Sequence, residues 1–250
     1  MESINDLPPQ LAANRRFWCG FAGADPDADL AIYRSGIGTG LHNGVLRVRD
    51  WPLDEAVEKA GNELADVSWS WWVGADSDPG TASGLIARGA HPLGEMPVMA
   101  VDVTTVEDAE DPAGLEIGAV YAPAEIAEYV RAYAGPLEIN PASVDGVIAG
   151  ELAFAYPEVI RIAGRIDGRI VGTCTLSLAS TEVGALYCIA TDPAYRRRGI
   201  ATALTREAVW LTGETGRQFA TLQATAEGEP VYQNIGFTTV SSYRLFHFGG

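Results

Sequence analysis

The chain has 250 residues, enough to bury a core as one large domain or as two small ones. Its 47% hydrophobic and 20% charged residues are typical of a soluble globular protein, and a formal net charge of −16 argues against a general nucleic-acid or anionic-membrane binder. No apolar run approaches the roughly 18 residues of a membrane span and the first residues do not resemble a signal peptide, so we expect a cytoplasmic protein without a membrane partner.

The first hundred residues alternate between strand and helix patterns. They predict two strands, a helix, a strand, a helix and a strand, at 28–37, 45–49, 54–65, 68–73, 79–88 and 96–103. Trp69, Trp71 and Trp72 are expected to pack in the core or at a domain interface rather than to form a ligand cage. The glycines of the run Gly36-Ile-Gly-Thr-Gly40 precede a turn and a strand instead of a helix, which favours a hairpin over a cofactor loop.

Residues 105–114 are acidic and contain Pro and Gly, which is typical of a linker. After this segment the elements predicted are two helices, three strands, a helix, a strand, a short helix and a strand. They span 123–134, 141–154, 159–166, 169–178, 182–191, 199 to about 213–216, 219–224, 229–234 and 238–248. The alternation predicts an α/β protein with a mixed sheet and helices on both faces. The order before the linker mirrors the second half of the order after it, which favours two related domains, 1–104 and 115–250.

The segment Asp192–Ala201 combines a basic loop with the start of a helix, directly after a predicted strand. The first turn of a helix leaves backbone N–H groups unpaired and carries partial positive charge. Gly199 allows the backbone to approach a ligand, and Arg196, Arg197 and Arg198 supply full charges suited to phosphate oxygens. In so acidic a chain, three consecutive arginines favour a bound polyanion; the alternative is an ordinary basic turn that starts an amphipathic helix.

Two motifs carry a family resemblance. The pattern Arg196-x-x-Gly199-x-Ala201 resembles the acyl-CoA-binding signature of GCN5-related N-acetyltransferases (GNAT), and Tyr232-x-x-x-Gly236-Phe237 resembles the Tyr-x-x-x-Gly-Phe element of the same family. With the elements between them, residues 115–248 resemble a complete GNAT domain. Residues 1–104 look like a degenerate second copy without the CoA signature, as in tandem members of the family.

The resemblance implies acetyl-CoA as the cosubstrate and gives each site residue a role. The family's fourth strand bulges and splays from the fifth, and the backbone of Ile189 and Thr191 is expected to bind the pantetheine amides. The Ile189 N–H would donate to the thioester carbonyl. The loop Arg196-Arg197-Arg198 and the amides up to Gly199, Ile200 and Ala201 would hold the pyrophosphate. Tyr232 would protonate the departing thiolate, after direct attack by a neutral amine.

One departure from the family concerns the general base. Histone-acetylating relatives place a catalytic Glu where this chain has Ala185. Glu182 and Glu227 are candidates that would act through water, although both also fit surface carboxylates. Cys188 lacks an adjacent His or Asp and is expected to be a core residue rather than an acyl-enzyme nucleophile.

The leading hypothesis is an acetyl-CoA-dependent N-acetyltransferase that acts on a primary amine of a small molecule or peptide. The alternatives are a non-catalytic acyl-CoA sensor or scaffold and a purely structural acidic protein. No metal is expected, because Cys19, Cys174 and Cys188 show neither metal-ligand nor disulfide spacing. The acceptor pocket is expected at the interface of the two halves, near the Trp-rich strand, and homodimer formation is left open.

Overall fold

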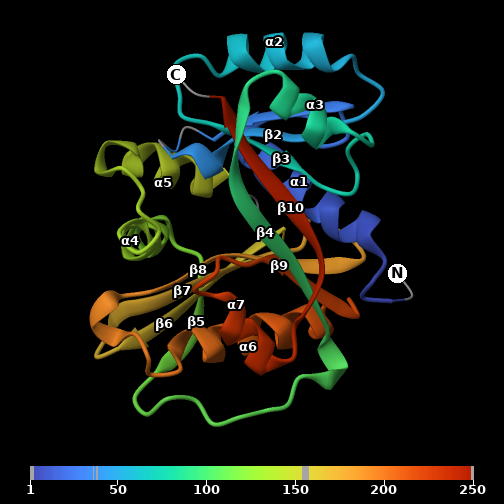
Figure 1. The fold of residues 1–250 in the computed structure, drawn as a ribbon. Helices are drawn as coiled ribbons and strands as arrows, with labels where there is room; N and C mark the ends of the chain where they lie inside the picture. Colours follow the sequence, from blue (N-terminus) through green and yellow to red (C-terminus); the bar gives the residue numbers. More distant parts are fainter. Residues whose placement is uncertain (1–2, 36, 38, 154–157, 249–250) are drawn as a thin grey trace.

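One mixed sheet of ten strands organises the molecule (Figure 1). The computed structural model describes residues 3–35, 37, 39–153 and 158–248. The strand order is β1-β2-β3-β10-β4-β9-β8-β7-β6-β5, and all neighbours are antiparallel except the parallel pairs β2–β3 and β8–β9. The predicted α/β class with a mixed sheet is confirmed. In the described ranges, no helix is both long and apolar enough to cross a membrane.

The N-terminal half begins with a helix that the sequence analysis did not predict. Its elements are α1 (Leu7–Ala22), β1 (Leu30–Arg34), η1 (Gly40–His42), β2 (Asn43–Val48), α2 (Leu53–Glu63), β3 (Ser70–Val73), α3 (Thr81–Ala87), β4 (Ala90–Asp102) and η2 (Val103–Thr105). The helix α1 escaped prediction because its buried face carries the polar residues Gln10, Asn14 and Arg15, which interrupt the apolar repeat. Gly36 and Gly38 lie outside the described residues, but β1 and β2 do pair antiparallel across this connection.

The C-terminal half follows the predicted order closely. Its elements are β5 (Glu116–Val120), α4 (Pro123–Ala134), η3 (Pro141–Ser143), α5 (Val144–Ala153), β6 (Val159–Ile166), β7 (Arg169–Ser177), β8 (Val183–Thr191), η4 (Pro193–Tyr195), α6 (Ile200–Glu214), β9 (Phe219–Gln223), α7 (Glu229–Ile235) and β10 (Thr238–Phe248). The edge strand β5 was missed, since only Val120 of its five residues is buried and the apolar signal is weak.

The two halves exchange one strand each. β4, from the N-terminal half, lies between β9 and β10, while β10, from the C-terminal half, lies between β3 and β4. The two long strands run side by side through the middle of the molecule (Figure 1) and pair from Thr238–Ala100 to Phe248–Ala90. The order β2-α2-β3-α3-β4 thus repeats as β8-α6-β9-α7-β10, each time with a parallel pair and an exchanged last strand. The predicted division at 105–114 stays a prediction, since the sheet is continuous across it.

The helices cover the sheet from both sides. α6 packs on β7 and β8 through Ile200, Leu204 and Ala208, which share a buried cluster with Leu186 and Leu222. α4, α5 and α1 lie on the opposite face, where Phe17 of α1 stacks on Tyr187 of β8 at 3.6 Å between ring centroids. Because α1 also contacts β1, it lies across both halves.

The strand exchange predicts that the halves unfold together. Five of the six tryptophans lie before residue 73, so tryptophan fluorescence reports mainly on the N-terminal half. We expect Leu222→Ala, a truncation of a buried β9 side chain, to destabilise the protein by about 2–5 kcal/mol and to shift the fluorescence and calorimetric transitions equally. Two resolved transitions, or an unmoved fluorescence midpoint, would contradict this expectation.

Candidate active site

Strand β8 carries a bulge at Cys188. Thr175 of β7 pairs with Tyr187 and Thr173 pairs with Ala190, so three steps along β8 oppose two along β7. Cys188 takes a left-handed conformation with φ of 49°, which is rare for a residue with a side chain. The Thr173 hydroxyl donates to the Cys188 carbonyl at 2.8 Å and fixes this geometry. The bulge therefore reorients the backbone of β8 at Cys188 and Ile189.

The parallel strands β8 and β9 separate just before this bulge. They pair only from Val183–Phe219 to Leu186–Leu222, although β8 continues to Thr191. Beyond Leu186, no described strand pairs with β8 on its β9 side. The backbone of Ile189 and Thr191 thus lies where β8 lacks a neighbouring strand, as expected for a strand that receives an extended ligand.

The basic loop forms a backbone turn with two left-handed residues, Arg197 at φ of 62° and Gly199 at φ of 81°. Gly199 is the N-cap of α6 and provides no side-chain cap. The first helical bond runs from the Ala203 N–H to the Gly199 carbonyl, so the amides of Ile200 and Ala201 have no acceptor within the helix. Alternating backbone conformations and free first-turn amides make an anion-binding concavity.

Side chains fix the conformation of this loop, while its three arginine side chains stay exposed to solvent. The Asp192 carboxylate accepts from the Ala194 N–H at 2.9 Å and pairs with Arg169. The Arg198 guanidinium lies 4.9 Å from the ring centre of Tyr195. Arg196, Arg197 and Arg198 are exposed, whereas the Ile200 side chain is buried in the core beneath α6, so only the backbone of Ile200 can face a ligand.

Tyr232 lies in α7, which follows β9 and ends at Gly236 in a left-handed conformation. The ring packs in the same core cluster as Leu222, and burial raises the pKa of its hydroxyl well above the ordinary value. The phenol is therefore protonated at neutral pH.

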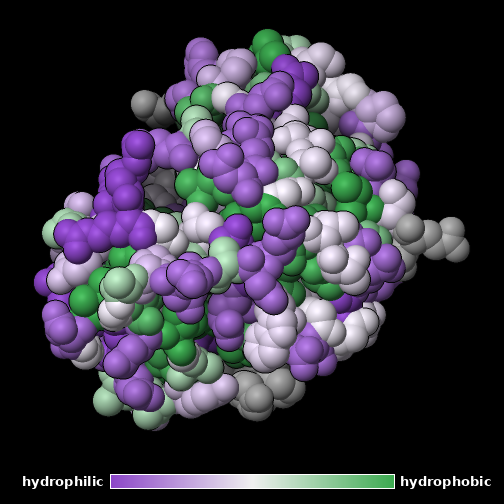
Figure 2. Space-filling model, turned by 90° about the horizontal axis from the view of Figure 1, so that it is seen from below, coloured by the Kyte–Doolittle hydropathy of each residue, from purple (hydrophilic) through white to green (hydrophobic). Residues whose placement is uncertain are grey.

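The acidic segment 105–114 lies next to the basic loop. Pro112 lies 3.4 Å from the position that a Cβ on Gly199 would take. A hollow of 590 Å³ lies between this segment and α6, lined in part by Asp108, Asp111 and Arg206. Because its carboxylates lie beside the basic loop, the acidic segment reduces the net positive potential around the arginines. Seen from below, the molecule shows mostly hydrophilic side chains with apolar patches between them (Figure 2).

A narrow apolar crevice of 10 Å³ lies beside the bulge, against α1 and α5. It is lined by residues of both halves, namely Phe17, Trp18, Phe21, Ile37, His42, Tyr133, Leu137, Ile139, Glu151 and Cys188. Burial lowers the pKa of His42 to about 4, so the ring is neutral. Glu151 accepts from Arg161 Nε at 2.8 Å and from the Tyr133 hydroxyl at 2.9 Å, which neutralises the carboxylate. Apart from Cys188, which the sequence analysis expected in the core, these residues were not singled out because they come from distant segments.

Two predicted carboxylates lie away from the bulge. Glu182 precedes the first residue of β8, and seven residues of strand put it about 23 Å from Ile189. Glu227 is exposed in the turn before α7. Ala185, at the family's carboxylate position, is buried beside Phe17. The geometry does not favour Glu182 as a general base, and its catalytic role stays a prediction.

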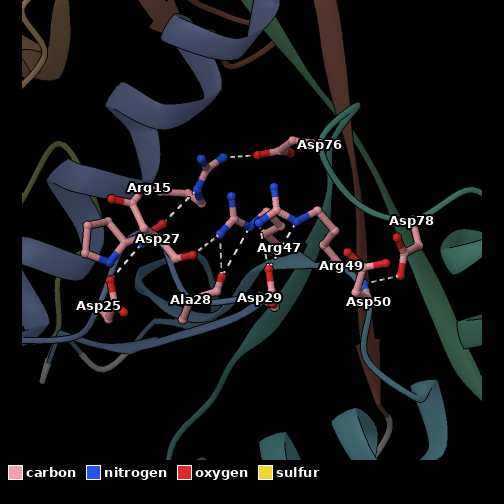
Figure 3. Close-up of polar contacts among 11 residues, drawn as sticks. Arg15, Asp25, Asp27, Ala28, Asp29, Arg47, Arg49, Asp50, Asp76 and Asp78 are labelled. Atoms are coloured by element: carbon pink, nitrogen blue, oxygen red, sulfur yellow. Dashed lines mark hydrogen bonds and ion pairs between the residues drawn. The ribbon is translucent and has the colours of Figure 1, made fainter.

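The equivalent position in the N-terminal half is closed. Where β2 and β3 would separate, the Asp78 N–H donates to the Val48 carbonyl at 2.8 Å, and the Asp78 carboxylate accepts from the Asp50 N–H at 2.8 Å. Arg49 is paired with Asp29 (Figure 3). The helix α2 begins with the acidic residues Asp54 and Glu55. Carboxylates in the first turn repel a phosphate, so this half does not repeat the anion-binding loop.

Comparisons with known proteins agree with this geometry. Residues 159–239 match the family model of the GNAT acetyltransferase domain. The chain is similar to the solved GCN5-related N-acetyltransferase from Kribbella flavida, at 17% identity and a TM-score of 0.74, covering 97% of this chain and 96% of that chain. A GCN5-related N-acetyltransferase from Sphaerobacter thermophilus gives 15% identity and a TM-score of 0.67, covering 98% of this chain and 93% of that chain.

A tandem GNAT protein from the clavulanic acid biosynthesis pathway is also similar, at 15% identity and a TM-score of 0.60, covering 87% of this chain and 77% of that chain. No curated protein sequence matches the chain. Within the described ranges, no group of three or more His, Cys, Asp and Glu side chains is arranged to hold a metal ion. The family match covers the bulged strand, the basic loop and Tyr232, and the solved structures show that nearly the whole chain has the fold of GCN5-related N-acetyltransferases.

Proposed function

We propose that the chain transfers an acyl group, by default acetyl, from acyl-CoA to a primary amine. The observation that carries this proposal is the bulge at Cys188 and Ile189, located where β8 leaves β9 and followed at once by the basic loop. A thioester bound along β8 would have its carbonyl at the bulge and its pyrophosphate at the start of α6.

The backbone supplies most of the donor site in this proposal. Ile189 and Thr191 bind the pantetheine amides as an added strand would, and the Ile189 N–H donates to the thioester carbonyl oxygen. That oxygen gains negative charge in the tetrahedral intermediate, so the interaction strengthens as the reaction proceeds. The amides of Arg197 to Ala201 bind the pyrophosphate, with the exposed arginines adding charge.

The reaction proposed is direct aminolysis. The neutral amine nitrogen forms a bond to the acyl carbon, the carbon–sulfur bond breaks, and Tyr232 donates a proton to the CoA thiolate. The amine loses its proton to water. An acyl-enzyme route through Cys188 is disfavoured, since burial raises the pKa of its thiol and keeps it protonated.

The second candidate function is a non-catalytic acyl-CoA sensor, motivated by Ala185 at the family's carboxylate position. Calorimetry and a thiol-release assay over a panel of primary amines separate the two. We expect one acetyl-CoA per chain, because the N-terminal counterpart of the site is closed, and CoA thiol release with at least one amine. Binding without release across the panel would favour the sensor, and absence of binding would exclude both.

Arg198→Glu tests the phosphate site. Removing a charge-assisted contact and adding repulsion should raise the Kd for acetyl-CoA about tenfold or more. Arg131→Glu, an exposed change on α4 with the same effect on net charge, is the matched control and should leave the Kd unchanged. Equal effects of the two variants would reduce the role of Arg198 to long-range electrostatics.

Tyr232→Phe tests the proton donor. Loss of the hydroxyl should lower kcat by about ten- to a hundredfold with little change in KM for acetyl-CoA, because the thiolate forms only as the reaction proceeds. Tyr33→Phe removes a buried hydroxyl bound to the Leu41 carbonyl at 2.6 Å and controls for stability. An unchanged kcat in Tyr232→Phe would make the residue a packing element only.

A further inference from the structure

Unpaired polar side chains lie beneath α1, where β8 and β9 separate. Asn14 and Tyr243 are fully buried and Tyr187 is 7% exposed. In the described part of the chain, the side-chain oxygen and nitrogen of Asn14, the hydroxyls of Tyr187 and Tyr243, and Gln223 Nε2 are buried without a hydrogen bond of good geometry, although the Asn14 amide lies near enough to the Tyr243 hydroxyl to oppose the rise of its pKa. Native interiors pair nearly all such groups, so a cluster of them calls for a physical explanation.

These side chains come from different elements but face the same side of the sheet. Tyr187 and Gln223 are the first residues beyond the last β8–β9 pair, Leu186–Leu222. Thr221, two residues before Gln223, bonds to Gln10 of α1, which places this side of β9 under the helix. Burial raises the pKa of Tyr187, and the nearby Tyr243 raises it further. The cluster thus lies next to the bulge, on the face opposite α6.

The charged groups around the cluster are already paired. Arg15 pairs with Asp76 and donates through Nε to the Pro26 carbonyl at 2.9 Å, and Arg47 donates to backbone carbonyls of Asp27 and Ala28 (Figure 3). Asp76 Oδ1 is buried and has no hydrogen-bond partner among the described residues. A ligand here would meet neutral donors and acceptors and one carboxylate oxygen, which repels an anion and accepts from a hydroxyl or amide.

We propose that Asn14, Tyr187, Gln223 and Tyr243 bind the acceptor, and that the acceptor is a small primary amine bearing hydroxyl or amide groups and no carboxylate. The inference rests on the proposed function, because it takes the thioester to lie at the bulge. Each unpaired group destabilises the protein when no ligand is bound. Because α1 covers these groups, the proposal requires α1 to move aside when the amine binds.

Asn14→Leu is the diagnostic variant, since it replaces unpaired polar atoms with an apolar side chain of similar size. We expect its Tm to rise by about 2–4 °C, while the KM for a hydroxyl-bearing amine rises at least about tenfold and the KM for acetyl-CoA stays unchanged. A role in packing alone would not couple higher stability to weaker acceptor binding.

Gln10→Leu is the matched control. Gln10 lies one helical turn earlier on α1 and is equally buried, but its side chain bonds to the Ile4 carbonyl and to the Thr221 hydroxyl. This variant should lower Tm and leave the acceptor KM unchanged.

A panel of amines tests the substrate class. We expect 2-amino-1,3-propanediol, glucosamine and glycinamide to give kcat/KM at least about tenfold above isobutylamine and cyclohexylamine, which lack polar groups, and above serine, which adds a carboxylate. Preference for apolar or carboxylate-bearing amines would overturn the assignment, as would an acceptor KM that Asn14→Leu leaves unchanged.

The two proposals fail in different ways. A chain that binds no acetyl-CoA refutes the proposed function itself. A chain that binds acetyl-CoA and acetylates other amines, but none of the hydroxyl- or amide-bearing ones, refutes the acceptor assignment alone.

Discussion

The pairing of β4 with β10 is the interaction on which the rest of the structure depends. Each of these strands completes the sheet of the other half, so β9 has its second neighbour only because the N-terminal half supplies β4. Without that neighbour, β9 would be an edge strand at the point where it separates from β8. The exchange therefore fixes the position of Gln223 relative to the bulge, and it makes the geometry of the donor site a property of the whole chain.

The same exchange explains how the N-terminal half contributes without a cofactor site of its own. Its counterpart of the opening is closed by Asp78, and its counterpart of the basic loop is acidic and internally paired. This half provides α1 instead, whose Phe17 stacks on Tyr187 of β8 and whose Asn14 lies beside Tyr243 of β10. In the proposed reaction, the C-terminal half binds the donor and the N-terminal half covers the acceptor.

The sequence predicted the elements around the basic loop well because their determinants are local. A strand, Gly199, three arginines and a helix start lie within ten residues, so local backbone geometry alone brings them together. The bulge at Cys188 was expected only from the family resemblance, since no residue type there demands a left-handed conformation. Trp72 of the Trp-rich strand packs edge-on against Tyr243. The expectation that this strand lies near the acceptor stays a prediction.

The acceptor side was not predictable for a related physical reason. Sequence patterns identify helices by apolar repeats, and α1 departs from such a repeat at Gln10, Asn14 and Arg15. A helix that buries polar atoms without full pairing gains less stability than an apolar one, so its sequence resembles a loop. If those atoms bind a ligand, the polar residues that kept α1 from being predicted are also the residues that bind the acceptor. Places where local sequence and fold disagree are where function is expected to lie, and in this chain the disagreement is concentrated on α1, which packs on β8.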